Sequence, residues 1–205
     1  MRQDQRRAWN REYRLRGRLW RGELKEKKIF LDNLVPGVTL DDGCGNGKGT
    51  PKIENLVGLD FSKFALSLYQ AESKVLGDIV HLPFKANTFS NVLLIHSLDH
   101  LRNEERTEAL LEAVRVLRDD GKIFVRVFSK SDFRYGKGKE VEGGTFRRGN
   151  GIETHYFGLK EFLNNRKYEV QRVINVDYHI NIQMKKFKRS EFIIILSKSK
   201  SKNNQ

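Results

Sequence analysis

A glycine-rich loop near residue 45 limits what this chain can fold into more than any other feature. The loop reads Leu40-Asp41-Asp42-Gly43-Cys44-Gly45-Asn46-Gly47, and it follows a short apolar run over 38–41 that we expect to be a strand. Glycines at such a junction let the backbone turn tightly and pass close to a ligand. The motif therefore predicts a ligand site at the end of a strand, with a helix expected after it.

Three kinds of ligand suit a glycine loop, and the residues favour one of them. A dinucleotide loop requires a third glycine where Lys48 stands, and a phosphate loop requires four residues, not three, between Gly43 and Gly47. Asp41 would repel a pyrophosphate but would hold the ammonium group of an amino-acid-like ligand. S-adenosylmethionine carries an ammonium, a sulfonium and ribose hydroxyls and has no phosphate. The loop therefore favours S-adenosylmethionine over a nucleotide.

Short apolar runs alternate with amphipathic stretches, which predicts an α/β fold with a parallel sheet. We expect strands at 38–41, 56–60, 75–77, 91–95, 122–128, 169–177 and 191–197, and helices at 5–16, 22–34, 62–72, 104–117 and 159–165. The length of 205 residues fits a single domain over 1–197. Within it we expect basic N-terminal helices in 1–35 and an inserted basic loop or hairpin over 130–152, followed by a disordered tail over 198–205.

Two further carboxylates stand at the ends of predicted strands. Asp60 ends the second strand and Asp78 ends the third. Open α/β sheets bind ligands at the carboxyl ends of neighbouring strands. We therefore expect Asp60 to accept hydrogen bonds from ribose hydroxyls and Asp78 to accept one from an adenine amino group.

The combined motifs resemble those of class I (Rossmann-like) S-adenosylmethionine-dependent methyltransferases. The resemblance rests on the glycine loop and on 57–62, 77–84 with 87–89, and 115–121. It implies S-adenosylmethionine as the cofactor and an open, mostly parallel seven-stranded sheet with helices on both faces and the last strand antiparallel. It also implies cofactor contacts from a set of loop and strand-end residues: Asp41, Gly43, Cys44, Gly45, Gly47, Asp60, Phe61, Asp78, Ile79 and Leu94.

The sequence departs from the superfamily pattern at several places. Asp42 stands where an aliphatic residue is usual, Ser90 stands where an aspartate is usual, and Asp119-Asp120 replaces a common Pro-Gly. The stretch between the glycine loop and Asp60 is short, so we expect a shortened first helix. None of these departures removes an expected cofactor contact.

The sequence also excludes two classes of methyl acceptor. No Asn/Asp-Pro-Pro-Tyr/Phe motif follows the fourth predicted strand, which disfavours methylation of an adenine amino group. The single cysteine, Cys44, lies in the glycine loop, so it is not placed to be the nucleophile that pyrimidine C5 methylation requires. One cysteine also excludes a disulfide framework and a cysteine-rich zinc site within these residues.

A second and looser resemblance concerns the acceptor. His96-Ser97-Leu98-Asp99-His100, Arg126 and the segment 151–157 resemble the family that esterifies the carboxymethyl group on the wobble uridine of tRNA. Asp99 replaces the first of two adjacent histidines in that family. The resemblance implies that an acceptor that is already a carboxylate is positioned by cations and hydrogen-bond donors, here His100, Arg126, His155 and Tyr156. It also implies a small zinc-ribbon activator as a partner.

The net charge of +13 is unevenly distributed. Residues 40–121 carry −4, whereas 1–28, 122–150 and 160–205 carry +7, +5 and +7. The surplus favours a polyanionic partner, for which we expect RNA and above all tRNA, and 9–20 interleave aromatic rings with arginines. We expect no membrane span and no secretory signal, hence a cytoplasmic protein. A small-metabolite methyltransferase and a methyltransferase-like binding subunit without activity stay open as alternatives.

Overall fold

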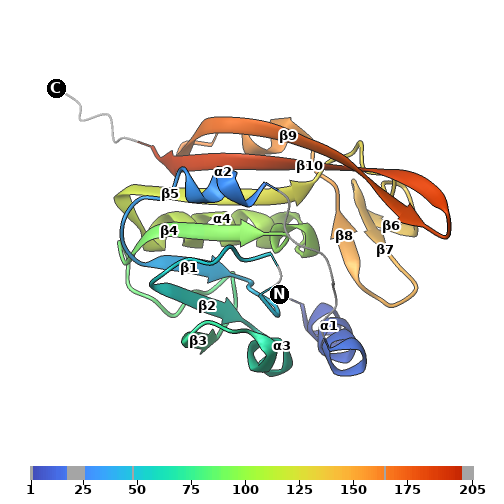
Figure 1. Ribbon diagram of the computed structural model, residues 1–205, viewed down its shortest axis with the longest axis horizontal. Helices are drawn as coiled ribbons and strands as arrows, with labels where there is room; N and C mark the ends of the chain where they lie inside the picture. Colours follow the sequence, from blue (N-terminus) through green and yellow to red (C-terminus); the bar gives the residue numbers. More distant parts are fainter. Residues whose placement is uncertain (1, 18–25, 48, 164, 200–205) are drawn as a thin grey trace.

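The chain folds around a seven-stranded sheet whose strands lie in the order β3-β2-β1-β4-β5-β10-β9 (Figure 1). This computed structural model describes residues 2–17, 26–47, 49–163 and 165–199. The strands of the sheet are β1 (Thr39–Asp42), β2 (Leu56–Asp60), β3 (Ser73–Leu76), β4 (Phe89–Ile95), β5 (Leu117–Phe128), β9 (Tyr168–Ile182) and β10 (Lys185–Lys198). The first five strands run parallel, and β10 runs antiparallel to β5. The predicted sheet, including its antiparallel last strand, is confirmed.

The central strands are buried because helices and loops cover both faces of the sheet. Val92, Leu93 and Leu94 on β4 are completely buried, as are 123–125 on β5. Side chains of successive strand residues point to opposite faces, so a strand buried on both sides reads as a continuous apolar run. This pattern is why the central strands were predicted at nearly their observed positions.

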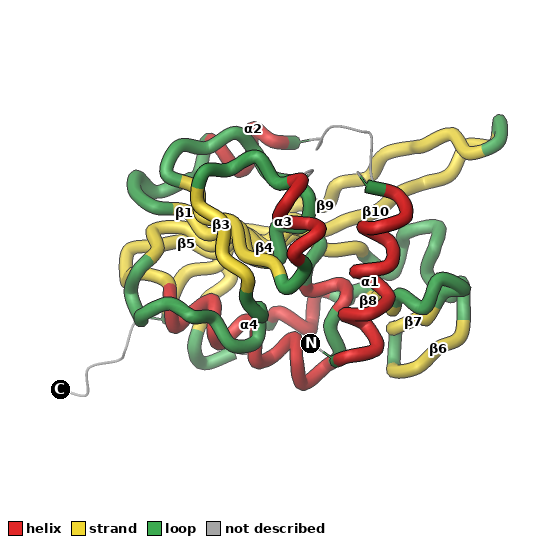
Figure 2. The backbone as a smooth tube through the Cα atoms, turned by 90° about the horizontal axis from the view of Figure 1, so that it is seen from below, coloured by secondary structure: helices red, strands yellow, loops and turns green. Residues whose placement is uncertain are grey.

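Helices cover both faces of the sheet, as predicted, but unequally (Figure 2). The helical segments are α1 (Gln3–Arg16), α2 (Lys27–Leu31), α3 (Lys63–Leu68), η1 (Leu98–His100), α4 (Asn103–Val116) and η2 (Leu159–Phe162). On one face α4 buries Ala109, Ala113 and Val116, which recur at helical spacing. On the opposite face the five-residue α2 buries Phe30 against Phe124. Part of the helix expected at 22–34 lies outside the described residues.

The helix expected after the glycine loop is absent from the described residues between β1 and β2. Gly43, Gly45 and Gly47 have φ values of +76°, +54° and +79°, which a right-handed helix cannot contain. The short connection must also return from the end of β1 to the start of β2. Because a helix rises only about 1.5 Å per residue and an extended chain more than about 3 Å, turns and extended backbone span this path with fewer residues. The prediction of a shortened helix is wrong for this reason.

The basic insertion and the C-terminal strands form two further features. The segment predicted as a loop or hairpin contains β6 (Lys139–Glu142) and β7 (Thr145–Arg147), which pair antiparallel and continue to β8 (Glu153–His155). Strands β9 and β10 are longer than predicted. Only the later part of β10 pairs with β5, so 177–190 extend past the sheet as a two-stranded arm (Figure 1). The end of the predicted disordered tail lies outside the described residues.

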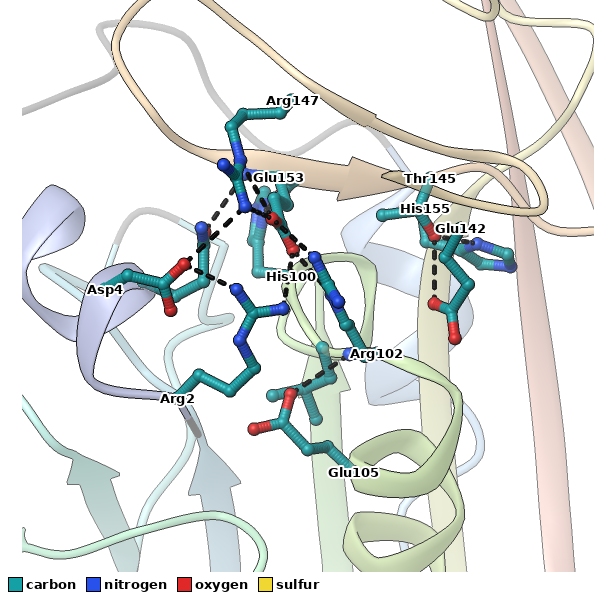
Figure 3. Close-up of polar contacts among 12 residues, drawn as sticks. Arg2, Asp4, His100, Arg102, Glu105, Glu142, Thr145, Arg147, Glu153 and His155 are labelled. Carbon is teal, nitrogen blue, oxygen red and sulfur yellow. Dashed lines mark hydrogen bonds and ion pairs between the residues drawn. The ribbon is translucent and has the colours of Figure 1, made fainter. Parts of the chain in front are cut away.

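Glu153 of β8 joins α1 to its surroundings through both its buried side chain and its backbone (Figure 3). Arg102 donates to both carboxylate oxygens of Glu153 at 3.1 and 3.0 Å, and Arg147 donates to one of them at 3.0 Å. Gln5 on α1 accepts a hydrogen bond from the Glu153 backbone N–H at 3.0 Å. These contacts join α1, β7, β8 and the start of α4. No helix among the described residues is long and apolar enough to cross a membrane.

Candidate active site

A cavity of about 880 Å³ lies beside the carboxyl ends of the central strands, next to α1. We divide the cavity into two parts, called the cofactor half and the acceptor half, and define each by its lining residues. The cofactor half is lined by Tyr13, Gly43, Cys44, Gly45, Asn46, Leu59, Asp60, Phe61, Ile79, Ile95 and Ser97. The acceptor half is lined by Trp9, Arg16, His96, His100, Arg126, Phe128, Arg134, Arg148, Tyr178, Arg189 and Glu191.

The glycine loop, which we call the cradle, lines the cavity and packs tightly against its neighbours. The N–H groups of Gly43 and Cys44 donate to the Leu59 carbonyl at 2.8 and 2.9 Å, which ties the loop to β2. A Cβ at Gly43 would lie 2.6 Å from the Ser97 Cβ, and a Cβ at Gly45 would lie 2.6 Å from the Tyr13 hydroxyl. Only glycine allows this loop to pass so close to its neighbours.

Asp60 is the carboxylate that faces the cofactor half. The Gly45 N–H donates to its Oδ2 at 2.9 Å, and the Ser62 N–H donates to its Oδ1 at 2.8 Å. Burial raises the pKa of Asp60 to about 6, although these hydrogen bonds act in the opposite direction. Each carboxylate oxygen accepts more than one hydrogen bond, so Asp60 keeps acceptor capacity toward the cavity. Its position at the end of β2 and the open cradle fit a ligand with a ribose diol.

The other predicted cofactor residues divide into two groups. Cys44, Phe61 and Ile79 line the cavity together with Gly43, Gly45 and Asp60. Four others do not line it: Asp41, Gly47, Asp78 and Leu94.

Each of these four has another place in the structure. Asp41 accepts hydrogen bonds from Thr50 and, at 2.9 Å, from the Tyr69 hydroxyl, so it braces the loop from behind. A Cβ on Gly47 would meet the same tyrosine ring at 2.8 Å. Asp78 forms an ion pair with Arg6 of α1. Leu94 is completely buried in the core, and its neighbour Ile95 lines the cavity instead.

The departure at Asp42 has a structural explanation. Its side chain is completely buried on the face of β1 that also buries Leu40, and neither of its oxygens has a hydrogen-bond partner among the described residues. Burial, together with the nearby carboxylates Asp41 and Asp60, raises the pKa of Asp42 well above its ordinary value. This shift favours the neutral form of the Asp42 carboxyl, which suits a position that is usually aliphatic.

His96 is a site residue that sequence reasoning missed. It follows β4 directly, has a φ of +57°, and stacks on Phe128 with ring centroids 4.3 Å apart. Its Nδ1 lies 2.8 Å from Asp99 Oδ2, and its Nε2 lies 3.5 Å from Glu191 Oε2. Burial alone would lower the pKa of His96, but these two carboxylates raise it above its ordinary value. The signal available in the sequence was its place at the carboxyl end of a central strand.

Buried ion pairs form the floor of the acceptor half. Arg126 Nε donates to Glu191 Oε2 at 2.6 Å, and both side chains are at most 2% exposed. The Tyr178 hydroxyl donates to Glu191 Oε1 at 2.8 Å. Arg189 pairs with Asp132 in the same region and is equally buried. Arg126 therefore lies at the predicted site, with its charge held by a residue from a different strand.

The remaining predicted acceptor residues lie at different depths. His100 lines the cavity, with Nδ1 2.8 Å from the Glu153 carbonyl and its ring against Trp9. Burial lowers the pKa of His100 below its ordinary value. His155 and Tyr156 do not line the cavity.

These two side chains have partners behind the cavity wall. The ring nitrogens of His155 are each 2.8 Å from an oxygen, one of Thr145 and one of Glu161. Tyr156 is 1% exposed, and its hydroxyl accepts a hydrogen bond from Arg148 at 3.3 Å. Both residues therefore support the wall from outside the site.

The three basic parts of the sequence meet at the acceptor half. Arg16 comes from α1, Arg134 and Arg148 come from the basic insertion, and Arg189 comes from β10. These residues are far apart in sequence. All three basic parts therefore contribute arginines to the same cavity as the glycine loop.

Comparison with known proteins agrees with this geometry. Residues 40–125 match the methyltransferase domain family. The chain is 38% identical over 111 residues to an uncharacterised protein of Methanocaldococcus jannaschii, covering 53% of this chain and 45% of that protein. It is 32% identical over 120 residues to the tRNA (carboxymethyluridine(34)-5-O)-methyltransferase of Xenopus tropicalis, covering 55% of this chain and 19% of that protein. The chain thus spans less than half the length of either relative.

The fold is shared with solved structures over most of the chain. An S-adenosylmethionine-dependent methyltransferase from Methanosarcina mazei superposes with a TM-score of 0.67 at 19% identity, covering 87% of this chain and 99% of that one. Residues 40–125 therefore match a methyltransferase domain, and the chain shares its fold with the class of S-adenosylmethionine-dependent methyltransferases. S-adenosylmethionine is the cofactor of this class, and the cradle and Asp60 fit it.

Proposed function

We propose that the chain is an S-adenosylmethionine-dependent methyltransferase acting on RNA, with a carboxymethyl group on a wobble uridine of tRNA as its acceptor. One observation carries the proposal: a single cavity joins the glycine cradle to a pocket whose wall contains Arg16, Arg134, Arg148 and Arg189. A cation-rich pocket beside a methyl donor suits an anionic acceptor on an anionic polymer. The resemblance to the tRNA methyltransferase of Xenopus tropicalis supports this acceptor.

In this proposal the cofactor half holds S-adenosylmethionine. Asp60 accepts hydrogen bonds from the ribose hydroxyls, and Phe61 and Ile79 pack against the adenine. Tyr13 and Trp9 of α1 close the cavity from the other side. When bound, the cofactor supplies a methyl group activated by a sulfonium. The protein contributes by holding donor and acceptor in line and by excluding water.

The acceptor half orients a carboxylate and needs no strong base. A carboxylate is ionised at neutral pH and is itself the nucleophile, so no proton has to be removed. Asp99 and Glu191 raise the pKa of His96 and so favour its charged form. We assign His96 to attract the acceptor carboxylate through its charge, because both of its ring nitrogens already face Asp99 and Glu191. His100 forms the neighbouring wall, with its Nδ1 bound to the Glu153 carbonyl. Arg126 positions Glu191, and through it His96, from below.

The test is methylation of bulk tRNA from a strain that lacks this gene. The protein is incubated with labelled S-adenosylmethionine, and the nucleosides are analysed by mass spectrometry. We expect a methyl ester on a wobble-uridine nucleoside that mild alkali releases as methanol. An Asp60→Ala variant should give no label. Alkali-stable label in RNA would contradict the ester, and label only in a metabolite extract would replace the RNA assignment with a small-molecule acceptor.

The same resemblance implies a small zinc-ribbon activator, which we include in the proposal. Such a protein would add a strand to one of the two edges of the sheet, β3 or β9. Copurification from the native cell tests it: a zinc-containing partner that raises the methylation rate supports the proposal. Full activity of the purified chain alone would remove this partner from it.

A further inference from the structure

A second, basic groove adjoins the acceptor half. It has a volume of about 550 Å³ and is lined by Phe133, Arg134, Lys137, Arg148, Ile180 and Arg189, among others. We propose that this groove binds the unpaired nucleotides next to the methyl acceptor, with Lys137 and Arg148 on phosphates and Phe133 stacked on a base. This inference rests on the proposed function, because it takes RNA as the substrate.

The groove is continuous with the acceptor half. Arg134, Arg148, Ile180 and Arg189 line both of them. A polymer whose acceptor group enters the cavity must leave it through a neighbouring surface, and these shared residues mark that exit. The next nucleotide along the strand would therefore meet the groove first.

The charge of the groove suits phosphate groups. Asp132 partly neutralises Arg189 and Arg134, with Arg134 Nε 3.4 Å from Asp132 Oδ1. No carboxylate of the described residues forms an ion pair with Lys137 or Arg148. Arg148 donates to the neutral Tyr156 hydroxyl, and Lys137 lies 4.7 Å from the Phe133 ring centroid. Two cations are thus available to an anion that enters the groove.

The aromatic ring distinguishes RNA from a simple anion. Phe133 is half-buried, with its ring centroid 4.8 Å from that of Phe187 on the arm, and its backbone N–H donates to the Lys188 carbonyl at 3.1 Å. The ring is therefore held in place at the groove wall. Aromatic faces combined with cations are how proteins hold single-stranded nucleic acid, because every base can stack. An acidic peptide would use the cations but would gain little from the ring.

The experiment measures binding of a labelled 12-nucleotide single-stranded RNA by fluorescence anisotropy at several salt concentrations. Phe133→Ala should weaken binding about tenfold through lost stacking, and Phe133→Tyr should restore most of it. Lys137→Gln should weaken binding about fivefold and reduce the slope of log affinity against log salt by about 0.7, the value for one phosphate of a single strand. Lys186→Gln is the matched control, because Lys186 is exposed on the arm and does not line the groove. It should stay within about twofold of the wild type.

The outcomes separate this inference from the proposed function. Cofactor affinity, measured by calorimetry, should be unchanged in all four variants, which shows that the domain is folded. If the wild type binds and methylates RNA but the Phe133 and Lys137 variants behave like Lys186→Gln, only the groove assignment is overturned. If the wild type neither binds nor methylates RNA, the proposed function itself has failed. Binding of polyglutamate, a polyanion without bases, is measured in the same way. If Lys137→Gln weakens the binding of RNA and of polyglutamate equally and Phe133→Ala changes neither affinity, the groove binds any polyanion and the RNA assignment is overturned.

Discussion

The two halves of the cavity are built in different ways. The cofactor half depends on backbone: three alternating glycines turn beside the end of β2, and Asp60 is held by two N–H groups. The acceptor half is made of side chains from α1, β4, β5, the basic insertion and the β9–β10 arm, joined by buried ion pairs. One half therefore depends on a short continuous sequence, and the other depends on how distant segments pack.

The pKa shifts of the carboxyl groups also differ in direction between the two halves. Asp41, Asp42 and Asp60 lie in or behind the cofactor half, and burial raises the pKa of each. In the acceptor half, Glu191 shows the opposite behaviour. Burial would raise the pKa of Glu191, but His96, Arg126 and the Tyr178 hydroxyl hold it below its ordinary range. Burial therefore dominates the pKa of the three aspartates, whereas neighbouring cations dominate the pKa of Glu191.

The largest effect should come from removing the charge at the centre of the acceptor half. Glu191→Ala leaves Arg126, Arg189 and His96 as buried cations without this carboxylate, so we expect a loss of about 3–5 kcal/mol in the free energy of unfolding. Urea denaturation measures it. Glu169→Ala, on the exposed side of β9, is the control and should change stability by less than about 0.5 kcal/mol. If Glu191→Ala lowered the free energy of unfolding as little as Glu169→Ala, the ion pair of Arg126 and Glu191 would not stabilise the acceptor half.

The matching test on the cofactor half is Asp60→Ala. It removes the two charge-assisted hydrogen bonds that we propose for the ribose hydroxyls, each of about 1.5–3 kcal/mol, and the supports of Gly45 and Ser62. We expect the Kd for S-adenosylmethionine to rise about a hundredfold or more in calorimetry. Asp120→Ala, at an exposed position of β5, should leave it unchanged. An unaltered Kd in Asp60→Ala would show that the ligand lies elsewhere in the cavity.

Asp42 tests whether negative charge is needed behind the glycine loop. A buried carboxyl without partners costs free energy, so Asp42→Val should raise the free energy of unfolding by about 1–2 kcal/mol. Because the folded-state pKa of Asp42 lies above the unfolded value near 4, wild-type stability falls as pH rises above 4, and the gain should grow with pH. Thermal unfolding at pH 4 and pH 7 measures both. A destabilised variant would mean that Asp42 has a partner in the folded protein.

The smallest expected effect is the pH dependence of cofactor binding. Asp60 has a pKa of about 6, and the ribose hydroxyls that we propose as its partners are held more strongly by the ionised carboxylate, so protonation weakens binding below that pH. Calorimetry should show affinity about tenfold lower at pH 5 than at pH 7.5. Asp60→Asn should bind more weakly but without this dependence. Asp41 has a similar pKa, so Asp41→Asn is the control: if it abolishes the dependence instead, Asp41 is the carboxyl that responds.

The accuracy of the sequence predictions follows the same division. The strands, α4 and six cofactor-half residues were predicted from local motifs and apolar runs, because these patterns are fixed by neighbours in sequence. Leu94 was predicted at the cavity, but its neighbour Ile95 lines it. Successive residues of a strand point to opposite faces, and a continuous apolar run does not show which of them points to the cavity. His155 and Tyr156 were predicted from a resemblance, but pairing of β8 with β7 turns them toward other partners.

The sequence by itself determined the fold class, the cofactor loop and the position of Asp60. These depend on glycine conformations and on apolar periodicity, which act over a few residues. Only the tertiary structure decided which cations share the cavity. Arg126 and Glu191 are 65 positions apart, and Arg134 and Arg189 reach the same site from separate segments. Burying a charge is favourable only beside an opposite charge, and such partners are chosen by sheet order and register, not by sequence distance.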